Sequence, residues 1–319
     1  MRDAVLGLDT SNYRTSIAAV DMEGNILLNQ RKLLPVAMGE RGLRQSDAVY
    51  LHLKQLKEME DATRHALNGF QVIAVAASTA PRGREDSYMP VFEVGDTLGR
   101  LVAATAGIPF FRSDHQQGHI WAARKGTFLE GEDAFLAVHL SGGTTDLLSI
   151  HAGDITELGG SLDLHAGQLV DRIGVAMGLP FPAGPELERM AERGTCDSLL
   201  GCSMASEDLQ CHFSGAETKA LSWIREKKMT QESIALEVYD LLARTIARML
   251  AAGKRDTGFR NALICGGVAS SALFRRMLTD RLRRKAPEMN VVFGDSVLSG
   301  DNAVGVALIG LDRYNRRTS

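Results

Sequence analysis

The sequence has few cysteines, few aromatic residues and no long apolar run. Four cysteines in 319 residues are too few for a disulfide scaffold, so we interpret them as reduced thiols. No apolar run approaches the roughly 20 residues that cross a bilayer, and no signal-like segment stands before the first expected strand, at Ala4. We therefore expect a cytoplasmic protein with no membrane partner. A metal cluster of three cysteines and one histidine is conceivable, although the paired CxxC spacing of zinc sites is missing; its members would be Cys196, Cys202, Cys211 and His212.

An excess of positive charge is also absent. The chain carries 36 Lys and Arg against 39 Asp and Glu, so it has no broad basic field for a nucleic-acid backbone. Its aromatic content of 6% gives no stacking platform for single-stranded RNA. If RNA is the substrate, a local patch or a partner protein must do most of the docking. A few arginines near the first loops are candidates for such contacts, although a scattered set is more typical of a solvated surface: Arg41, Arg44, Arg82, Arg84 and Arg112.

Two segments of the chain share one design. Residues 5–20 and 135–150 each contain an apolar strand, a short run of small or hydroxyl residues, and a second apolar strand. A third strand follows each pair, over residues 25–33 and 154–158, after a Gly-Asn or Gly-Asp turn. This duplication predicts two similar lobes, residues 1–133 and 134–319, with the last helix packing back on the first lobe.

Helical periodicity alternates with short strands after each triplet. We predict mixed β-sheets with helices outside them, and a surface excursion over residues 194–211, where no period is visible. The predicted helices cover residues 46–67, 94–106, 166–177, 185–192, 214–227, 232–252, 271–285 and 301–314, and the later strands cover 72–77, 109–111, 262–265 and 290–293.

The two hairpin turns have the composition of an anion site. Asp9-Thr10-Ser11 and the run from Ser141 to Thr145 offer clustered backbone N–H groups and hydroxyls, which suit a phosphate. Asp9 would repel phosphate, but it could hold a metal ion or a water molecule. Gly266-Gly267-Val268 lies between a buried strand and a helix, where a nucleotide can approach the backbone. One such turn alone favours an ordinary connection, but the matched pair favours a phosphate site between the lobes.

Two histidines are spaced for a shared metal ion. His115 and His119 lie four residues apart, so a helix would put both imidazoles on one face. A carboxylate must complete the ligand set, and Asp301 is the candidate, although an aspartate before a helix is also a common cap.

These motifs, taken in order, resemble the TsaD (Gcp) family over nearly the whole chain. Seven motifs in the same order are far more specific than any one of them. They are His115-Gln116-Gln117-Gly118-His119 for the family's HMEGH, Leu140 to Thr145 for VSGGHT, Ala166 to Asp171 for AGEAFD, Phe181 to Pro185 for YPGGP, Phe213 to Thr218 for FSGLKT, Gly266-Gly267-Val268 for GGV, and Asp301-Asn302 for the terminal DN.

The resemblance implies a fold, a reaction and a set of ligands. It implies the two-lobed α/β fold of actin and the sugar kinases (the ASKHA fold), with iron or zinc held by His115, His119 and Asp301. It also implies transfer of threonylcarbamoyl from its adenylate to N6 of the adenosine after the tRNA anticodon, with a TsaB-like protein as partner. We assign Asp9 and Ser11 to the reaction centre. The expected nucleotide-binding residues are Ser141, Gly142, Gly143, Thr144, Asp171, Gly184, Gly266, Gly267 and Ser271.

Several positions depart from the family's pattern. Arg14 replaces a glutamate of the opening ETSCDE signature, Thr144 a histidine, Glu217 a lysine, Ser271 an asparagine and Gln168 a glutamate. The chain therefore resembles a divergent paralogue. Two alternatives to the tRNA transferase follow: a non-catalytic nucleotide-binding scaffold, and an ATP-dependent small-molecule carbamoyl transferase or kinase, for which the aspartate at Asp9 gives slight support.

Overall fold

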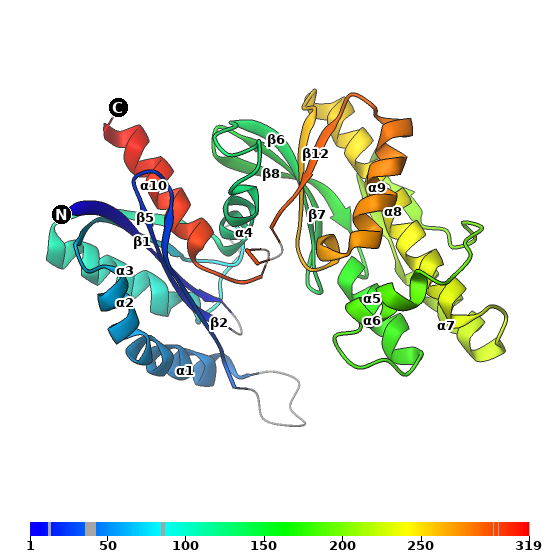
Figure 1. Ribbon diagram of the computed structural model, residues 1–319, viewed down its shortest axis with the longest axis horizontal. Coiled ribbons are helices and arrows are strands. Elements are labelled where there is room, and N and C mark those ends of the chain that lie inside the picture. The colour runs from blue at the N-terminus through cyan, green and yellow to red at the C-terminus, as the bar shows by residue number, and fades with distance from the viewer. Residues whose placement is uncertain (12–13, 36–42, 84–86, 296, 299, 319) are drawn as a thin grey trace. The chain divides into compact units, whose positions relative to one another are not determined.

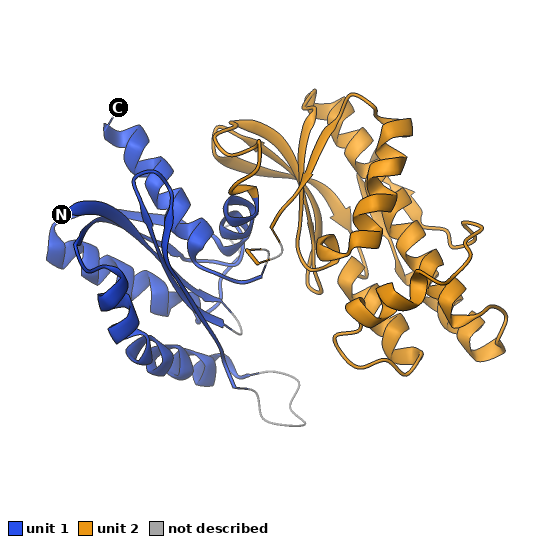
Figure 2. Cartoon of the chain, viewed as in Figure 1, with its two compact units in different colours: residues 1–123, 300–319 blue, residues 124–299 orange. Residues whose placement is uncertain are grey.

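A computed structural model describes residues 1–11, 14–35, 43–83, 87–295, 297–298 and 300–318. It divides into two compact units, one of residues 1–123 with 300–319 and one of residues 124–299 (Figure 2). The sequence prediction put the division later, at 133/134. Two of the arginines considered for RNA contacts, Arg41 and Arg84, lie outside the described residues.

Unit 1 is built on a five-stranded sheet with the order β3-β2-β1-β4-β5. β1 pairs antiparallel with β2 and parallel with β4, so a hairpin opens the sheet and crossovers complete it. The elements are β1 (Arg2–Ser11), β2 (Arg14–Asp21), β3 (Ile26–Leu33), α1 (Gln45–Glu58), α2 (Glu60–Ala66), β4 (Phe70–Ser78), α3 (Phe92–Ala106), β5 (Phe110–Ser113), α4 (His115–Arg124) and α10 (Val304–Thr318).

Strand β1 is buried on both faces because a helix covers each of them. Leu6 and Leu8 point into a cluster that includes Ala103 of α3. On the other face a Cβ at Gly7 would lie 2.6 Å from the backbone of Ala303 and Ala307, so glycine permits the close approach of α10. Figure 1 shows α3 and α10 on opposite sides of this sheet.

Unit 2 is built on a seven-stranded sheet with the order β12-β11-β6-β7-β8-β10-β9. The long helix α8 crosses its core, and most of its residues are buried. The elements are β6 (Ala134–Leu140), β7 (Thr145–His151), β8 (Asp154–Ser161), α5 (Ala166–Ala176), α6 (Gly184–Ala191), β9 (Ser203–Ala205), the 3-10 helix η1 (Ser206–Asp208), β10 (Gln210–His212), α7 (Ser214–Glu226), α8 (Gln231–Thr257), β11 (Asn261–Cys265), the 3-10 helix η2 (Val268–Ser270), α9 (Ala272–Lys285) and β12 (Asn290–Phe293).

The two sheets share one topology (Figure 1). The order β3-β2-β1-β4-β5 in unit 1 matches β8-β7-β6-β11-β12 in unit 2, and each pair of neighbours runs in the same relative direction. The duplication predicted from the two opening segments is therefore present in the fold.

Four details differ from the sequence prediction. Residues 9–11 are part of strand β1 and not of a turn, because they pair with residues 14–16 of β2. The helix predicted over 46–67 breaks at Met59 into α1 and α2. The expected excursion over 194–211 contains β9 and leads into β10, which extend the sheet edge. The last helix begins at Val304, so Asp301 precedes it.

Among the described residues no helix has both the length and the apolar character needed to cross a membrane.

Candidate functional site

The first candidate site lies in unit 1, where α4 begins. The carboxylate of Asp114 accepts a hydrogen bond of 2.8 Å from the backbone N–H of Gln117 and so fixes the first turn of the helix. His115 and His119 then project from one face, as the spacing predicts, and their Nε2 atoms lie 3.0 Å apart. Gly118 lets α10 approach on the other side, since a Cβ there would lie 3.1 Å from the Val306 side chain.

Asp301 joins the two histidines from the segment before α10. Its Oδ1 lies 3.4 Å from Nε2 of His119 and 3.7 Å from Nε2 of His115. A tetrahedral ion with bonds of about 2.0–2.1 Å needs ligand atoms about 3.3 Å apart, so these three separations fit one ion. Two nitrogens and one oxygen suit zinc or iron, and three protein ligands leave coordination positions for substrate or water. The Asp301 side chain is 36% exposed, so the position is accessible to solvent.

Asp9 fixes the orientation of His115 through a hydrogen bond. Its Oδ2 accepts a hydrogen bond of 2.8 Å from Nδ1 of His115, and its Oδ1 accepts one of 2.5 Å from the Ser78 hydroxyl. The carboxylate therefore holds the His115 ring with Nε2 facing His119 and Asp301, as is usual around metal ligands. Asp9 is only 1% exposed, so it has no open surface on which a substrate can bind.

The other two residues of the predicted opening turn are buried. Thr10 donates to the Val91 carbonyl at 2.8 Å and accepts from the Gly95 N–H at 3.1 Å, which anchors the start of α3. Ser11 is 3% exposed, and its hydroxyl has no hydrogen-bond partner in the described part of the chain. The prediction of a turn at residues 9–11 is wrong, because these residues end strand β1 and pair with residues 14–16 of β2.

The charged groups of this cluster change one another's pKa values. Burial disfavours the charged form of His115, but the carboxylates of Asp9, Asp301 and Asp114 outweigh it and raise the pKa of His115 to about 9. Burial also disfavours the charged form of Asp301, yet its bond to His119 and nearby positive charges lower its pKa. One of those charges is Arg14, whose Nη1 lies 3.4 Å from the Asp301 carbonyl oxygen. The residue that departs from the family's opening signature therefore lies beside a predicted metal ligand.

The second candidate site is a pocket of about 370 Å³ in unit 2. Six of the nine predicted nucleotide residues line it, and three do not, namely Gly143, Thr144 and Gly266. The lining comprises Ser141, Gly142, Gly167, Val170, Asp171, Pro182, Gly184, Pro185, Glu188, Tyr239, Gly267, Val268, Ser270 and Ser271.

The wall of this pocket depends on close backbone contacts. The Ser141 N–H donates to the Thr144 carbonyl at 2.8 Å, which closes the turn between β6 and β7. A Cβ at Gly167 would lie 2.7 Å from the backbone of Ser141 and Gly142, so glycine brings the start of α5 against this turn. Gly266 has a φ of 97°, and a Cβ there would lie 2.2 Å from the Leu140 carbonyl. Gly266 thus shapes the wall of the pocket without lining it.

The polar lining groups of the pocket have structural partners. Asp171 accepts from the Ala183 N–H at 2.8 Å, and Ser271 accepts from the Phe274 N–H at 3.1 Å as the N-cap of α9. Glu188 and Tyr239 are among the lining residues that sequence reasoning missed. The Tyr239 hydroxyl donates to the Gly184 carbonyl at 3.0 Å, and Glu188 accepts from the Leu273 N–H at 2.8 Å. Glu188 is four residues beyond Gly184 on α6, so helical periodicity alone could have placed both residues on the face that lines the pocket.

Two further departures from the family's pattern have local partners. The Gln168 side chain accepts from the His165 N–H at 3.2 Å, which caps α5 as a glutamate would. Glu217 forms an ion pair with Arg172 at 3.2 Å. Neither Gln168 nor Glu217 lines the pocket.

The cysteine cluster considered from the sequence is not assembled among the described residues. There, the group of possible metal ligands that contains a cysteine is Cys196 with Glu237 and Asp240.

Comparison with protein families finds a match over most of the chain. A model of the TsaD family, described as tRNA N6-adenosine threonylcarbamoyltransferase, matches residues 88–308, more than half of the chain.

Solved structures share the fold at low sequence identity. HypF of T. kodakarensis is 15% identical with a TM-score of 0.65; the match covers 98% of this chain and 48% of that one, so this chain spans about half its length. A ROK family glucokinase from Streptomyces griseus, in complex with glucose and AMPPNP, is 16% identical with a TM-score of 0.55, covering 97% and 99%. The activator of the 2-hydroxyisocaproyl-CoA dehydratase from Clostridium difficile, with bound ADPNP, is 13% identical with a TM-score of 0.54, covering 99% and 97%. The predicted ASKHA fold is confirmed.

Proposed function

Because the chain belongs to the TsaD family, we propose that it is a tRNA N6-adenosine threonylcarbamoyltransferase. The reaction would move threonylcarbamoyl from its adenylate to N6 of the adenosine that follows the anticodon. The N6 amine attacks the carbamoyl carbonyl carbon and gives up one proton to solvent, the bond from that carbon to the adenylate phosphate oxygen breaks, and AMP leaves. The proposed cofactor is one divalent ion, iron or zinc, and the proposed location is the cytoplasm.

The convergence of His115, His119 and Asp301 is the observation that carries this proposal. When bound, the ion would supply Lewis-acid polarisation of the carbamoyl carbonyl and stabilise the charge that builds on its oxygen. Asp9 accepts a hydrogen bond from Nδ1 of His115, so Nε2, after losing its own proton to solvent, would be the atom that holds the ion. Asp301 adds a negative charge, which would favour binding of a divalent cation.

The pocket of unit 2 supports the adenylate part of the proposal. The exposed turn at Gly142 offers backbone N–H groups to a phosphate, and the glycine keeps side chains out of the way. Val170 and Val268 offer apolar surface for a base. Since an adenylate is a good leaving group, these residues act by holding the donor in position and not by protonating it.

The tRNA needs a partner under this proposal. The chain has a net charge of −3, so docking of a polyanion depends on a second subunit or on one local patch. We propose a TsaB-like protein as that subunit.

The test is transfer of threonylcarbamoyl to tRNA by the purified chain with a TsaB-like partner and a threonylcarbamoyl-adenylate source. Digested tRNA is analysed for the modified nucleoside by mass spectrometry. We expect modification by the wild type and by the exposed control His65→Ala, and its loss in His115→Ala/His119→Ala. Absence of product from a wild type that contains metal would contradict the proposal.

One observation favours a second candidate, a nucleotide-binding scaffold without transferase activity. Arg14, which stands where the family's pattern has a glutamate, brings positive charge close to Asp301. A scaffold would bind adenine nucleotide and partner in the same experiment but form no modified tRNA, with or without Arg14→Glu. Restoration of activity by Arg14→Glu would instead identify the arginine as the cause. ATP-dependent modification of a small molecule without tRNA would support the kinase-like alternative.

A further inference from the structure

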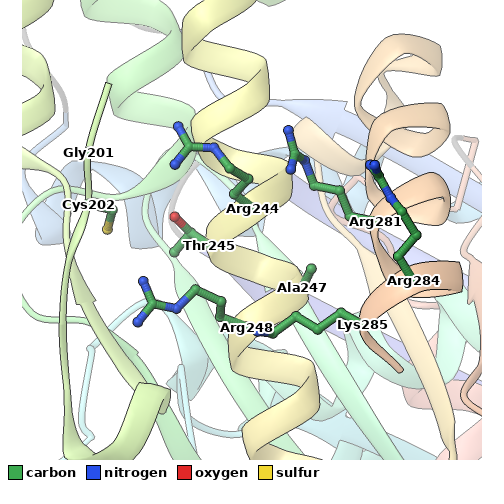
Figure 3. A pocket seen from close by; sticks show the side chains of 9 residues that line it. All are labelled: Gly201, Cys202, Arg244, Thr245, Ala247, Arg248, Arg281, Arg284 and Lys285. Carbon is green, nitrogen blue, oxygen red and sulfur yellow. The ribbon is translucent and has the colours of Figure 1, made fainter. Parts of the chain in front are cut away.

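A basic cavity in unit 2 has no part in the proposed transfer reaction. It has a volume of about 580 Å³ and is lined by Gly201, Cys202, Arg244, Thr245, Ala247, Arg248, Arg281, Arg284 and Lys285. In Figure 3, Arg244 and Arg248 extend from α8 toward the segment with Gly201 and Cys202, while Arg281, Arg284 and Lys285 extend from α9. We call these five cationic side chains the basic cluster.

Helical spacing makes the cluster. Arg244 and Arg248 are four residues apart on α8, so they lie on one face of it. Arg284 and Lys285 follow Arg281 by three and four residues on α9, and they share one face too. Arg281 and Lys285 are therefore about one helical turn apart on α9.

The positive charge of the cluster is only partly neutralised. Asp240 pairs with Arg244 at 2.7 Å and with Arg281, and Asp208 pairs with Arg248 at 2.7 Å. Two carboxylates against five cations leave a formal excess of three positive charges. Over the part of the chain that the structure describes, neither Arg284 nor Lys285 pairs with a carboxylate. Like charges this close repel one another, so such an excess is unfavourable without a counter-ion.

The ion pairs also preorganise the donors. Asp240 is 2% exposed and fixes two guanidinium groups from different helices. Arg248 uses its Nε and Nη2 on Asp208, and Arg244 uses Nη2 on the Leu200 carbonyl. Each guanidinium has five N–H donors, so each keeps donors for a ligand while its orientation is held.

We propose that this cavity binds the diphosphate group of a small ligand. A diphosphate ester carries about three negative charges at neutral pH, which matches the excess on the cluster. Planar guanidinium groups bind phosphate oxygens in pairs, and the volume is that of a small-molecule site. The cavity is concave and local in a chain without a broad basic field, so a small ligand fits it better than a nucleic-acid backbone.

Cys202 provides a reporter inside the cavity. Its thiol accepts a hydrogen bond from Cys211, which with a further bond from Thr245 lowers the pKa of Cys202. We therefore expect Cys202 to be alkylated more readily than Cys211 and Cys265, which are buried. A ligand in the cavity would shield Cys202 from a small neutral alkylating reagent.

The test is calorimetric titration of the full chain with inorganic diphosphate, which lacks a base and so does not depend on an adenine site. The test variant is Arg284→Ala/Lys285→Ala, in which both replaced side chains are exposed and folding should persist. The matched control is Arg283→Ala, which is exposed on the same helix and does not line the cavity. We expect saturable binding by the wild type and the control, and a dissociation constant about tenfold or more higher in the test variant.

Alkylation of Cys202 by iodoacetamide, mapped by mass spectrometry, gives a second readout. Diphosphate should slow alkylation in the wild type and in Arg283→Ala but not in the test variant. The proposal is overturned if the wild type does not bind diphosphate, or if the test variant binds it as tightly. It is also overturned if the test variant loses only affinity for tRNA, since the cluster would then contact a nucleic-acid backbone.

Discussion

Units 1 and 2 use the same strand order but differ at the end of their first strand. In unit 1, Asp9 and Ser11 end β1 in a buried position, and the Asp9 side chain bonds to His115. In unit 2, Ser141 and Gly142 follow β6 at a partly exposed turn that lines a pocket. One topology therefore yields a side-chain site in the first unit and a backbone site in the second.

The difference predicts opposite sensitivities to mutation. A metal cluster depends on the identity and charge of a few side chains, so replacing one group removes a ligand or its support. A backbone site depends on close approach, so added carbon atoms damage it while most polar replacements do not. The predictions below test this contrast.

The largest effect is expected for Asp9→Asn in unit 1. The amide lacks the charge that holds the Nδ1 proton of His115, so affinity for the divalent ion should fall about tenfold to a hundredfold. Competition with a chelator of known affinity measures the change. Asp3→Asn, on the exposed start of the same strand, is the control and should bind the ion normally. Unchanged affinity in Asp9→Asn would mean that the contact with His115 does not support the ion.

Next comes Gly167→Ala in unit 2. The added carbon would lie 2.7 Å from the backbone of Ser141 and Gly142, so α5 or the turn must move. We expect a loss of about 1–3 kcal/mol in the free energy of unfolding and weaker binding of adenine nucleotide. Chemical denaturation and fluorescence titration measure these. Gly143→Ala meets no atom within 4 Å and should change stability by less than about 0.5 kcal/mol; equal effects in the two variants would refute the close-contact account.

A smaller effect is expected for a carboxylate of unit 2 that caps a helix. Asp163 accepts from the N–H groups of Phe213 and Ser214 at 2.8 and 3.2 Å, at the start of α7. Asp163→Asn should cost about 1 kcal/mol of stability at pH 7. Asp154→Asn, exposed at the start of β8, is the control.

The same carboxylate sets a pH dependence. Partial burial opposes its charged form, but hydrogen bonds from Ser214, Leu164 and Phe213 outweigh this and lower the pKa of Asp163 to about 2. Because the folded-state pKa lies below the ordinary value of 3.8, the stabilisation is present above pH 3.8 and is lost as pH falls toward 2. The stability difference between wild type and Asp163→Asn should therefore shrink in acid. A difference that is constant from pH 7 to pH 2 would contradict the capping role.

The smallest effect is expected for Arg172→Ala. Its ion pair with Glu217 lies at the surface, with the arginine side chain 55% exposed, so its loss should cost about 0.5 kcal/mol or less. Nucleotide affinity should not change, because neither residue lines the pocket. A large loss of affinity would show that the departure at Glu217 matters for the site.

The fold was largely predictable because the same pattern of apolar residues occurs in both of its duplicated halves. The strands on either side of Ser141 lie where the apolar pattern indicates, whereas the helix that carries His115 and His119 was not among the predicted helices. Asp9 was assigned to a turn because small polar residues interrupt the apolar run, whereas strand pairing with β2 decides its conformation. β9 and β10 have three residues each, too few for a periodicity to be visible.

Long-range contacts limited prediction of the sites. Asp301 reaches His119 across a large sequence separation, so the residues alone named it only as a candidate ligand that could equally cap a helix. Tyr239 lies in a long buried helix whose pattern indicates core packing and nothing more. The basic cluster needs two helices to lie side by side, and its residues are ordinary surface arginines when α9 is read alone.

The most direct test of the account is calorimetric titration of the metal-free chain with zinc. The wild type should bind about one ion per chain at high affinity, and His115→Ala/His119→Ala should bind none, with His65→Ala as the control. Both outcomes follow from three converging side chains in unit 1. A wild type that binds no ion, or a double variant that keeps its affinity, would contradict the claim that this unit carries the metal site.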